Sequence, residues 1–328
     1  YKALNNNTAS GNTAVGNTAL FANTTAGGNT AVGNTALFTN TIGTNNTAVG
    51  FQALFATTTA GSNTAVGSRA LRGNTGSGNT AVGDTALFLN GIGSYDTAMG
   101  YGALYNNTTG YFNTAVGSQA LTLNTTGMLN TAMGQQALAN NTIGNGNLAI
   151  GAKAGFYQTV GHNNMYLSHL GVAGESGTIR FGTPGTQTRA FLAGVAGVPV
   201  SGSVVQVDAN GQLGITPSSR RYKEAIENMG TASQGLLHLR PVTFRYTPEV
   251  ATGERRREYG LIAEEVAEVY PELVGHDAEG QIVTVQYHEL IPMLLNEVQR
   301  QQREIELLRG QHRQLEALTA RVAELEAK

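Results

Sequence analysis

A five-residue motif, Asn-Thr-Ala-Val-Gly or a close variant, recurs through the first half of the chain. Its apolar fourth residue returns every 17 residues, except for one interval of 16 residues. Each repeat contains too few apolar side chains to bury a core alone, so consecutive repeats must stack and share one. The sequence therefore predicts a solenoid. The apolar fourth residues are Val15, Val32, Val49, Val66, Val82, Met99, Val116, Met133 and Ile150.

Within each repeat, a short alternating segment is followed by residues typical of turns. Thr, Ala and Val alternate with the period of a strand, and an Ala-Leu pair follows most motifs. The segments between them are rich in Gly and Asn, which adopt positive φ angles at low cost. These patterns favour β-coils over helical repeats. We expect a mainly β protein with a β-roll or β-solenoid shaft over residues 1–155.

The repeats resemble the head repeats of trimeric autotransporter adhesins, through units such as residues 29–33 (Asn-Thr-Ala-Val-Gly). In that family, short coils form a left-handed parallel β-roll and three chains pack together. The resemblance implies a trimeric shaft. Residues 1–4 match the end of a repeat, as a comparison with residues 101–104 indicates. We therefore expect the natural chain to begin upstream, with any export signal or anchor.

Charged residues are scarce in the repeats, which excludes several kinds of partner. They make up 13% of the chain, and the net charge of -2 provides no basic stripe, so we expect no nucleic-acid partner. The chain contains no cysteine for a disulfide framework. No apolar run reaches about 18 residues, so we expect no membrane span in this segment. The charged residues up to position 152 are Lys2, Arg69, Arg72, Asp84 and Asp96.

The first residue of each short segment forms a column of threonines from Thr13 to Thr131. Such a column can present a flat hydroxyl face to ice or to a carbohydrate, or it can be an ordinary solvated strand face. A typical glycosidase needs two carboxylates about 5 to 10 Å apart, and the repeats contain only Asp84 and Asp96. We therefore expect the shaft to bind or to act as a spacer.

The 17-residue period lapses after Gly155, and residues 156–217 are predicted to form a β-rich neck. Runs typical of strands continue at 178–181, 190–200 and 204–215. The last run contains Asp-Ala-Asn-Gly at residues 208–211, which is a turn signal, so we expect a hairpin there.

After Ser218 the composition becomes charged, and five blocks resemble one known domain. The domain is the intramolecular chaperone of endosialidases and other phage tailspikes, found also in the myelin regulatory factor. The resemblance implies a chaperone domain over residues 218–292 and assembly as a trimer. The blocks are 218–226 (Ser-Ser-Arg-Arg-Tyr-Lys-Glu-Ala-Ile), 239–246 (Leu-Arg-Pro-Val-Thr-Phe-Arg-Tyr), 259–266 (Tyr-Gly-Leu-Ile-Ala-Glu-Glu-Val), 271–274 (Pro-Glu-Leu-Val) and 287–295 (Tyr-His-Glu-Leu-Ile-Pro-Met-Leu-Leu).

The same resemblance implies a self-cleaving site at the head of this domain. In the family, a serine and a lysine five residues later cut the chain just before the serine. Here Ser218 would be the nucleophile, Lys223 the general base and Pro217-Ser218 the scissile bond. A lysine can accept the proton only when burial or nearby cations lower the pKa of its ammonium group, and Arg220 and Arg221 are close in sequence.

Two features bear on this interpretation. The family usually has aspartate after the serine, whereas this chain has Ser219. In the alternative interpretation, Ser218 or Ser219 caps a helix that begins near Arg221.

The last segment, residues 293–328, is predicted to form a trimeric coiled coil. Its seam residues recur at alternating steps of four and three, and the trimer number comes from the family resemblance. We assign His312 to the seam rather than to a metal. The other five histidines show no metal-ligand spacing, so we expect no metal and no cofactor. The seam residues are Leu294, Val298, Gln301, Ile305, Leu308, His312 and Leu315.

Together these patterns predict a structural or adhesive homotrimeric fibre, extracellular, on a cell surface or a phage tail. Its partners would be further copies of itself and a surface glycan or protein receptor. One alternative is a carbohydrate- or ice-binding solenoid whose C-terminal domain is a permanent, uncut trimer clamp. Another is a regulator released from a membrane by the same cleavage, although this segment has neither a membrane span nor a basic DNA-binding module.

Overall fold

A computed structural model describes residues 2–187, 189–193, 195, 201–208, 210–250, 255–277 and 279–326. The chain divides into two compact units, Tyr1–Val198 and Pro199–Lys328. The first is a parallel β-solenoid, and the second contains short strands, short helices and a long C-terminal helix. This architecture confirms the predicted fold class.

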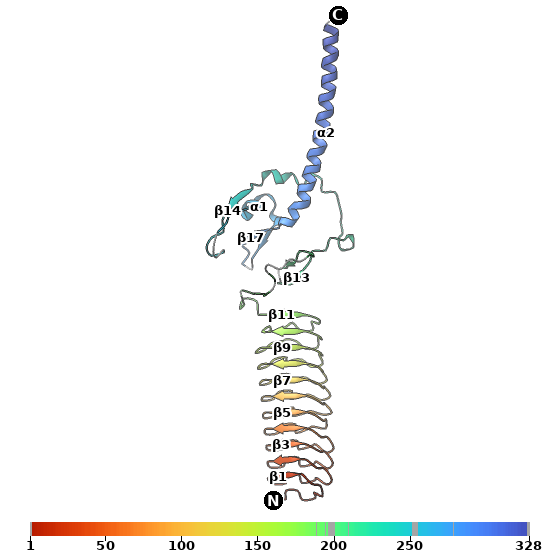
Figure 1. Ribbon diagram of the computed structural model, residues 1–328, viewed down its shortest axis with the longest axis vertical. Helices are drawn as coiled ribbons and strands as arrows, with labels where there is room; N and C mark the ends of the chain where they lie inside the picture. The colour runs from red at the N-terminus through yellow and green to blue at the C-terminus, as the bar shows by residue number, and fades with distance from the viewer. Residues whose placement is uncertain are drawn as a thin grey trace. The chain divides into compact units, whose positions relative to one another are not determined.

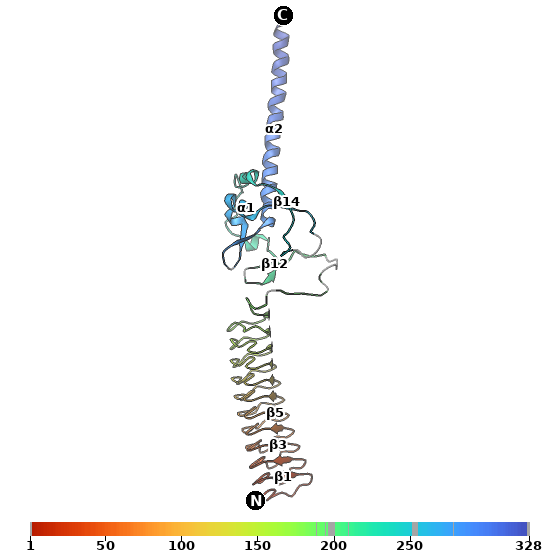
Figure 2. The ribbon, with the colours of Figure 1, turned by 90° about the vertical axis from the view of Figure 1, so that its left-hand side faces the viewer.

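The solenoid places one three-residue strand in each coil, and the strands form a single parallel sheet in sequence order (Figure 1). The register aligns equivalent residues of neighbouring repeats, for example Thr30 with Thr47 and Val32 with Val49. The 90° view shows the strands on one side of the coils (Figure 2). The strands are β1 (Thr13–Val15), β2 (Thr30–Val32), β3 (Thr47–Val49), β4 (Thr64–Val66), β5 (Thr80–Val82), β6 (Thr97–Met99), β7 (Thr114–Val116), β8 (Thr131–Met133), β9 (Leu148–Ile150), β10 (Met165–Leu167) and β11 (Ile179–Phe181).

Small and medium apolar side chains fill the interior of the coils. The central Ala of the strands points inward, as at Ala31 and Ala48, and the Ala-Leu pair is fully buried, as at Ala36 and Leu37. Each Leu of these pairs has a φ angle near +50°, for example 49° at Leu37. A positive φ costs an L-residue about 1–2 kcal/mol, but burying a leucine contributes about 1.5–3 kcal/mol. Stacked leucines therefore share the positive-φ corners with the expected glycines and asparagines, such as Gly33 (φ 140°) and Asn45 (φ 59°).

Most asparagines lie inside the coils, where they form two hydrogen-bonded ladders. In the first ladder, the Asn29 Oδ1 accepts from the Asn46 backbone N at 2.9 Å, and the Asn29 Nδ2 donates to the Gly43 carbonyl at 2.9 Å. In the second, the Asn40 Nδ2 donates to Asn23 Oδ1 at 2.9 Å. The ladders satisfy buried backbone groups that would otherwise destabilise the interior. The asparagines of the second ladder also fix local turns, as the sequence predicted, because the Asn40 Nδ2 donates to the Gly43 carbonyl three residues later at 2.9 Å.

One position of the first ladder holds Asp96 instead of asparagine. The carboxylate is fully buried and accepts hydrogen bonds from the Asn113 backbone N at 2.8 Å and from the Asn107 Nδ2 at 3.0 Å. Burial raises the pKa of Asp96 to about 7, although hydrogen bonds from Asn113 and Asn107 partly oppose that shift. A carboxylic acid therefore titrates near neutral pH inside the shaft.

The parallel sheet continues beyond the predicted end of the repeats at residue 155. Strand β10 pairs with β9 and β11 pairs with β10, so the coils run on to Phe181. The period was hard to recognise because Tyr166 stands where earlier coils have Ala. Gly155 stands where they have Leu, and a Cβ there would lie 2.7 Å from the Tyr166 ring. The larger Tyr166 is thus accommodated by the smaller Gly155, and the Tyr166 ring fills the last part of the core.

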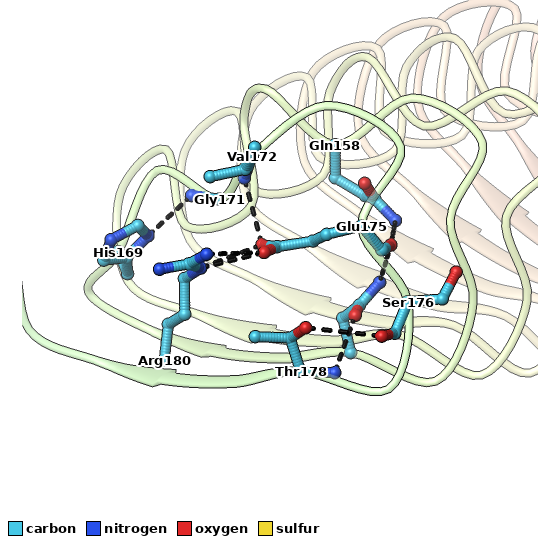
Figure 3. A network of polar contacts seen from close by, with 9 residues as sticks. Gln158, His169, Gly171, Val172, Glu175, Ser176, Thr178 and Arg180 are labelled. Atoms are coloured by element: carbon cyan, nitrogen blue, oxygen red, sulfur yellow. Dashed lines mark hydrogen bonds and ion pairs between the residues drawn. The ribbon is translucent and has the colours of Figure 1, made fainter. Parts of the chain in front are cut away.

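A polar network closes this end of the solenoid (Figure 3). The Glu175 carboxylate accepts from Arg180, with Nη2 at 2.7 Å, and from the Val172 backbone N at 3.0 Å. The Glu175 carbonyl accepts from Gln158 and Asn164, which end the two amide ladders. Burial alone would raise the pKa of Glu175, but the hydrogen bonds from Arg180 and Val172 outweigh it and lower the pKa below its usual value. This network satisfies the polar groups at the end of the coils that the structure describes.

The predicted hairpin in the neck is confirmed. Strands β12 (Gln206–Val207) and β13 (Leu213–Gly214) are antiparallel. The Asp208 carboxylate accepts from the backbone N of Asn210 at 2.9 Å and of Gln212 at 2.8 Å, which forms the turn. In the run 190–200, residues 194 and 196–200 lie outside the described residues, and the described ones contain no strand.

The rest of the second unit is built from two hairpin-like strand pairs and several helices. Strands β14 (Val242–Phe244) and β15 (Glu258–Gly260) pair antiparallel, as do β16 (Val274–His276) and β17 (Ile282–Val285). The long helix α2 (Tyr287–Glu326) begins before the predicted boundary at 293 and contains Pro292. The remaining elements are η1 (Arg220–Tyr222), η2 (Gln234–His238), α1 (Ala263–Val269) and η3 (Pro271–Leu273).

Candidate functional site

Ser218 and Lys223 lie on either side of the one-turn helix η1. Ser219 is the N-cap residue, with an extended backbone and no capping hydrogen bond from its side chain, and Lys223 follows the turn, also extended. The alternative interpretation, a helix beginning near Arg221, is therefore reduced to a single 3-10 turn. The guanidinium of Arg221 lies 4.7 Å from the ring centroid of Tyr222.

The whole segment around the predicted cleavage site faces solvent in the single chain. Residues 210–232 are all exposed, including Pro217, Ser218 and Lys223. Within the described part of the chain, no hydrogen bond joins the Ser218 hydroxyl to the Lys223 ammonium group. A serine hydroxyl is a weak nucleophile until a positioned base takes its proton. One chain alone thus supplies neither the contact nor the burial that a Ser-Lys pair requires, and the assignment stays a prediction.

The segment is followed by a compact core. The buried side chains come from α1, η3, β16, β17 and the first turns of α2, and they include Val266, Leu273 and Met293. The Tyr270 hydroxyl donates to the Ala232 carbonyl at 2.9 Å, and burial raises the pKa of Tyr270. The hydrogen bond from Tyr270 thus fixes the C-terminal end of the exposed segment 210–232 to this core.

A polar cluster joins the same region to helix α2. The Asn296 Nδ2 donates to the Ser233 Oγ at 2.7 Å and to the Gly230 carbonyl at 3.0 Å. The buried Glu297 carboxylate accepts from the Arg300 Nε at 3.1 Å, and this bond lowers the pKa of Glu297. Ser233 and Glu297 are also buried against each other, 3.5 Å apart between Oγ and Oε2. The sequence did not reveal this cluster, because 64 residues separate its two buried members and no motif joins them.

Comparison with known families identifies the C-terminal region. A family model described as chaperone of endosialidase matches residues 218–275. The C-terminal region therefore carries an intramolecular chaperone domain of this type. The match begins at Ser218, the predicted head of the domain, and covers η1, the segment around Ser233 and most of the compact core. No curated protein and no solved structure matches the chain.

The chaperone domain and the solenoid fit a protein similar to a tail fibre, with a shaft followed by a C-terminal chaperone. None of the described helices has the length and apolar character needed to cross a membrane.

Proposed function

We propose that this chain is one strand of a homotrimeric fibre, structural or adhesive, on a cell surface or phage tail. Its C-terminal domain acts as an intramolecular chaperone that aligns three chains. The match to the chaperone family at residues 218–275 carries this proposal, because that family implies trimer assembly. A surface glycan or protein is the expected receptor of such a fibre, as in the adhesins that the repeats resemble.

A shaft of this kind has a specific need for a chaperone. Its coils are nearly identical, so that three chains shifted by one repeat would make almost the same contacts. A trimeric domain at one end removes these alternatives, because it brings equivalent coils to the same level before the shafts associate. Once formed, the fibre would be held mainly by a slow rate of dissociation.

The long helix α2 supports assembly from several copies. Its seam residues are exposed in the single chain, including Leu294, Ile305 and Leu308. A mainly apolar seam with heptad spacing, here interrupted by Gln301 and His312, is typical of a coiled coil. The family match implies that three such helices form the coiled coil.

A pair of adjacent leucines provides a test of this seam. Leu308 lies in the seam and Leu307 lies outside it, yet both side chains are exposed in the single chain. We expect Leu308→Glu to weaken the trimer strongly, since a buried charge without a partner costs several kcal/mol. Leu307→Glu, the matched control, should leave the trimer intact. Sedimentation equilibrium measures both masses, and equal behaviour of the two variants would contradict a coiled coil with this seam.

We further propose that the assembled chaperone cuts the chain before Ser218. The exposed position of Ser218 and Lys223 supports a requirement for assembly, because neighbouring copies would have to bury the pair. We expect intact mass spectrometry of the freshly expressed chain to show two fragments divided between Pro217 and Ser218. Ser218→Ala should give only the uncut 34.3 kDa chain. An uncut chain in both samples would instead favour a domain that remains as a permanent trimer clamp.

A further inference from the structure

The outer face of the solenoid strands carries an unbroken apolar column. We call this the strand face and define it as the first and third residues of β1 to β11. The third residue is Val, Met, Ile, Leu or Phe in all eleven strands, and no first or third residue is charged. Along the shaft the column is partly open to solvent in the single chain, with exposed fractions of 36% at Val32 and 44% at Met99 and Met133. An exposed apolar stripe of this length marks an interaction surface.

Other outward positions of the coils do not share this uniformity. The second residue after each strand changes freely from coil to coil, from Asn34 to Phe51, Ser68, Asp84 and Tyr101. A half-buried aromatic column, which includes the stacked pair Phe38 and Phe55, is interrupted by Arg72. Positions that only face water tolerate such changes. The strand face is therefore under a constraint that these neighbouring columns lack.

Strand propensity does not fully account for that constraint. Thr and Val are good strand formers because their branched side chains suit a pleated surface. Met99 and Met133 are unbranched, yet they keep the apolar character of the column. The shared property is thus an apolar contact surface, which flexible methionines also provide.

The C-terminal end of the strand face indicates what covers it. The threonine column ends at β8, and the first residues of the last three strands are Leu148, Met165 and Ile179. An array of hydroxyls for ice or for a carbohydrate would lose its pattern here. These apolar residues would instead bind another protein surface more tightly than threonines do. They lie at the end of the shaft that leads in sequence to the chaperone domain.

We infer that the strand face is where the three shafts pack against one another, so that its occupants are two further copies of this chain. This inference rests on the proposed trimeric function. The chaperone aligns the chains in parallel, so each strand meets the same strand of the other copies. The three apolar coils at the end would favour the aligned register, because a shift by one coil would place Leu148 of one chain against Thr131 of another and leave Ile179 without its apolar counterpart.

The size of the strand face explains why it would need the chaperone. Eleven strands about 4.8 Å apart, each about 10 Å long, give a flat area on the order of 500 Å². A stable interface usually buries about 800 Å² on each partner. The shafts would thus associate only weakly alone, and more firmly once the C-terminal domain holds them at high local concentration.

Two neighbouring side chains allow a direct test. Met99 lies on the strand face, whereas Tyr101, two residues later, lies on the adjacent variable column, and both are substantially exposed. The chain has no native cysteine, so single cysteines can be placed in the full chain as Met99→Cys and Tyr101→Cys. After treatment with an oxidant or a short bismaleimide, we expect a cross-linked dimer band only for Met99→Cys. Sedimentation of the same samples reports whether the chain is a trimer.

The outcomes separate this inference from the proposed function. A trimer that cross-links at position 101 and not at 99, or at neither, would overturn the strand-face inference and leave the trimer standing. A monomer would overturn both. As a second measurement, Met99→Lys should widen the cross-section of the shaft in small-angle scattering, while Tyr101→Lys should not. An equal cross-section for the two lysine variants would also overturn the inference.

Discussion

Asp96→Asn is expected to stabilise the solenoid at neutral and alkaline pH and to have little effect on its stability in acid. Asp96 is buried in the first amide ladder, where burial raises the pKa of its carboxyl group from 3.8 to about 7. The folded state therefore holds this proton more tightly than the unfolded state. The stability of the natural chain falls as the pH rises from about 4 to about 7, because folding then opposes ionisation.

The expected size follows from the shift. Each pKa unit corresponds to about 1.4 kcal/mol, so the penalty removed by Asp96→Asn approaches roughly 4 kcal/mol above pH 7. Above pH 7 the new amide can also donate a hydrogen bond that the carboxylate cannot, as its equivalents do, for example Asn79 to the Gly93 carbonyl and Asn113 to the Gly127 carbonyl. Both effects strengthen the same coil.

Hydrogen exchange of strands β5 to β7 at pH 5 and pH 8 measures this effect locally. Asp84→Asn is the matched control, because Asp84 lies in the preceding coil and is exposed. The control should change exchange little at either pH. A gain for Asp96→Asn that is the same at both pH values would show that the carboxyl group does not titrate in this range.

Tyr166→Ala is expected to destabilise the last coils of the solenoid by about 3–5 kcal/mol, the usual cost of removing a buried aromatic ring. The Tyr166 ring is fully buried and occupies the space that Gly155 leaves open. Among the described residues, β11 is the last strand of the sheet, so no later strand covers the cavity. Because a solenoid is stabilised mainly by contacts between neighbouring coils, the loss should stay near β9 to β11.

Tyr157→Ala serves as the control for this experiment. Tyr157 belongs to the same end of the solenoid but is largely exposed, so its removal should have a small effect. Hydrogen exchange of residues 148–181, compared with that of β2 to β4, separates local from global loss. Equal loss of protection along the entire shaft would contradict the expectation that Tyr166 stabilises only the coils near β9 to β11.

The spacing of the repeats accounts for most of the fold that could be predicted. A 17-residue period with Ala at the centre of each strand leads to coils in register, with that Ala inside. The last two coils were missed because Tyr166 replaces Ala, Gly155 replaces Leu, and β11 follows β10 after only 14 residues, from Met165 to Ile179. Tyr166 and Gly155 compensate for each other in space, but together they interrupt the Ala and Leu pattern by which the repeat is recognised in sequence.

The candidate site was predictable only in part. The blocks after Ser218 were sufficient to recognise the chaperone domain, which the family match supports. The geometry between Ser218 and Lys223 is a different matter, because both side chains face solvent in one chain and their pairing stays a prediction. The cluster of Ser233, Asn296 and Glu297 could not be foreseen, since it forms only when the long helix packs against a distant segment.

The sequence by itself determined the β-solenoid, its coil length and the presence of the C-terminal chaperone and helix, because periodicity and local motifs are properties of neighbouring residues. Only the tertiary structure decided that leucines join the glycines at positive-φ corners, that asparagines point inward, and that Asp96 is buried among them. The reason is physical: a turn hydrogen bond depends on nearby residues alone, whereas a ladder hydrogen bond forms only when stacked coils bring equivalent residues together and bury backbone groups that need partners.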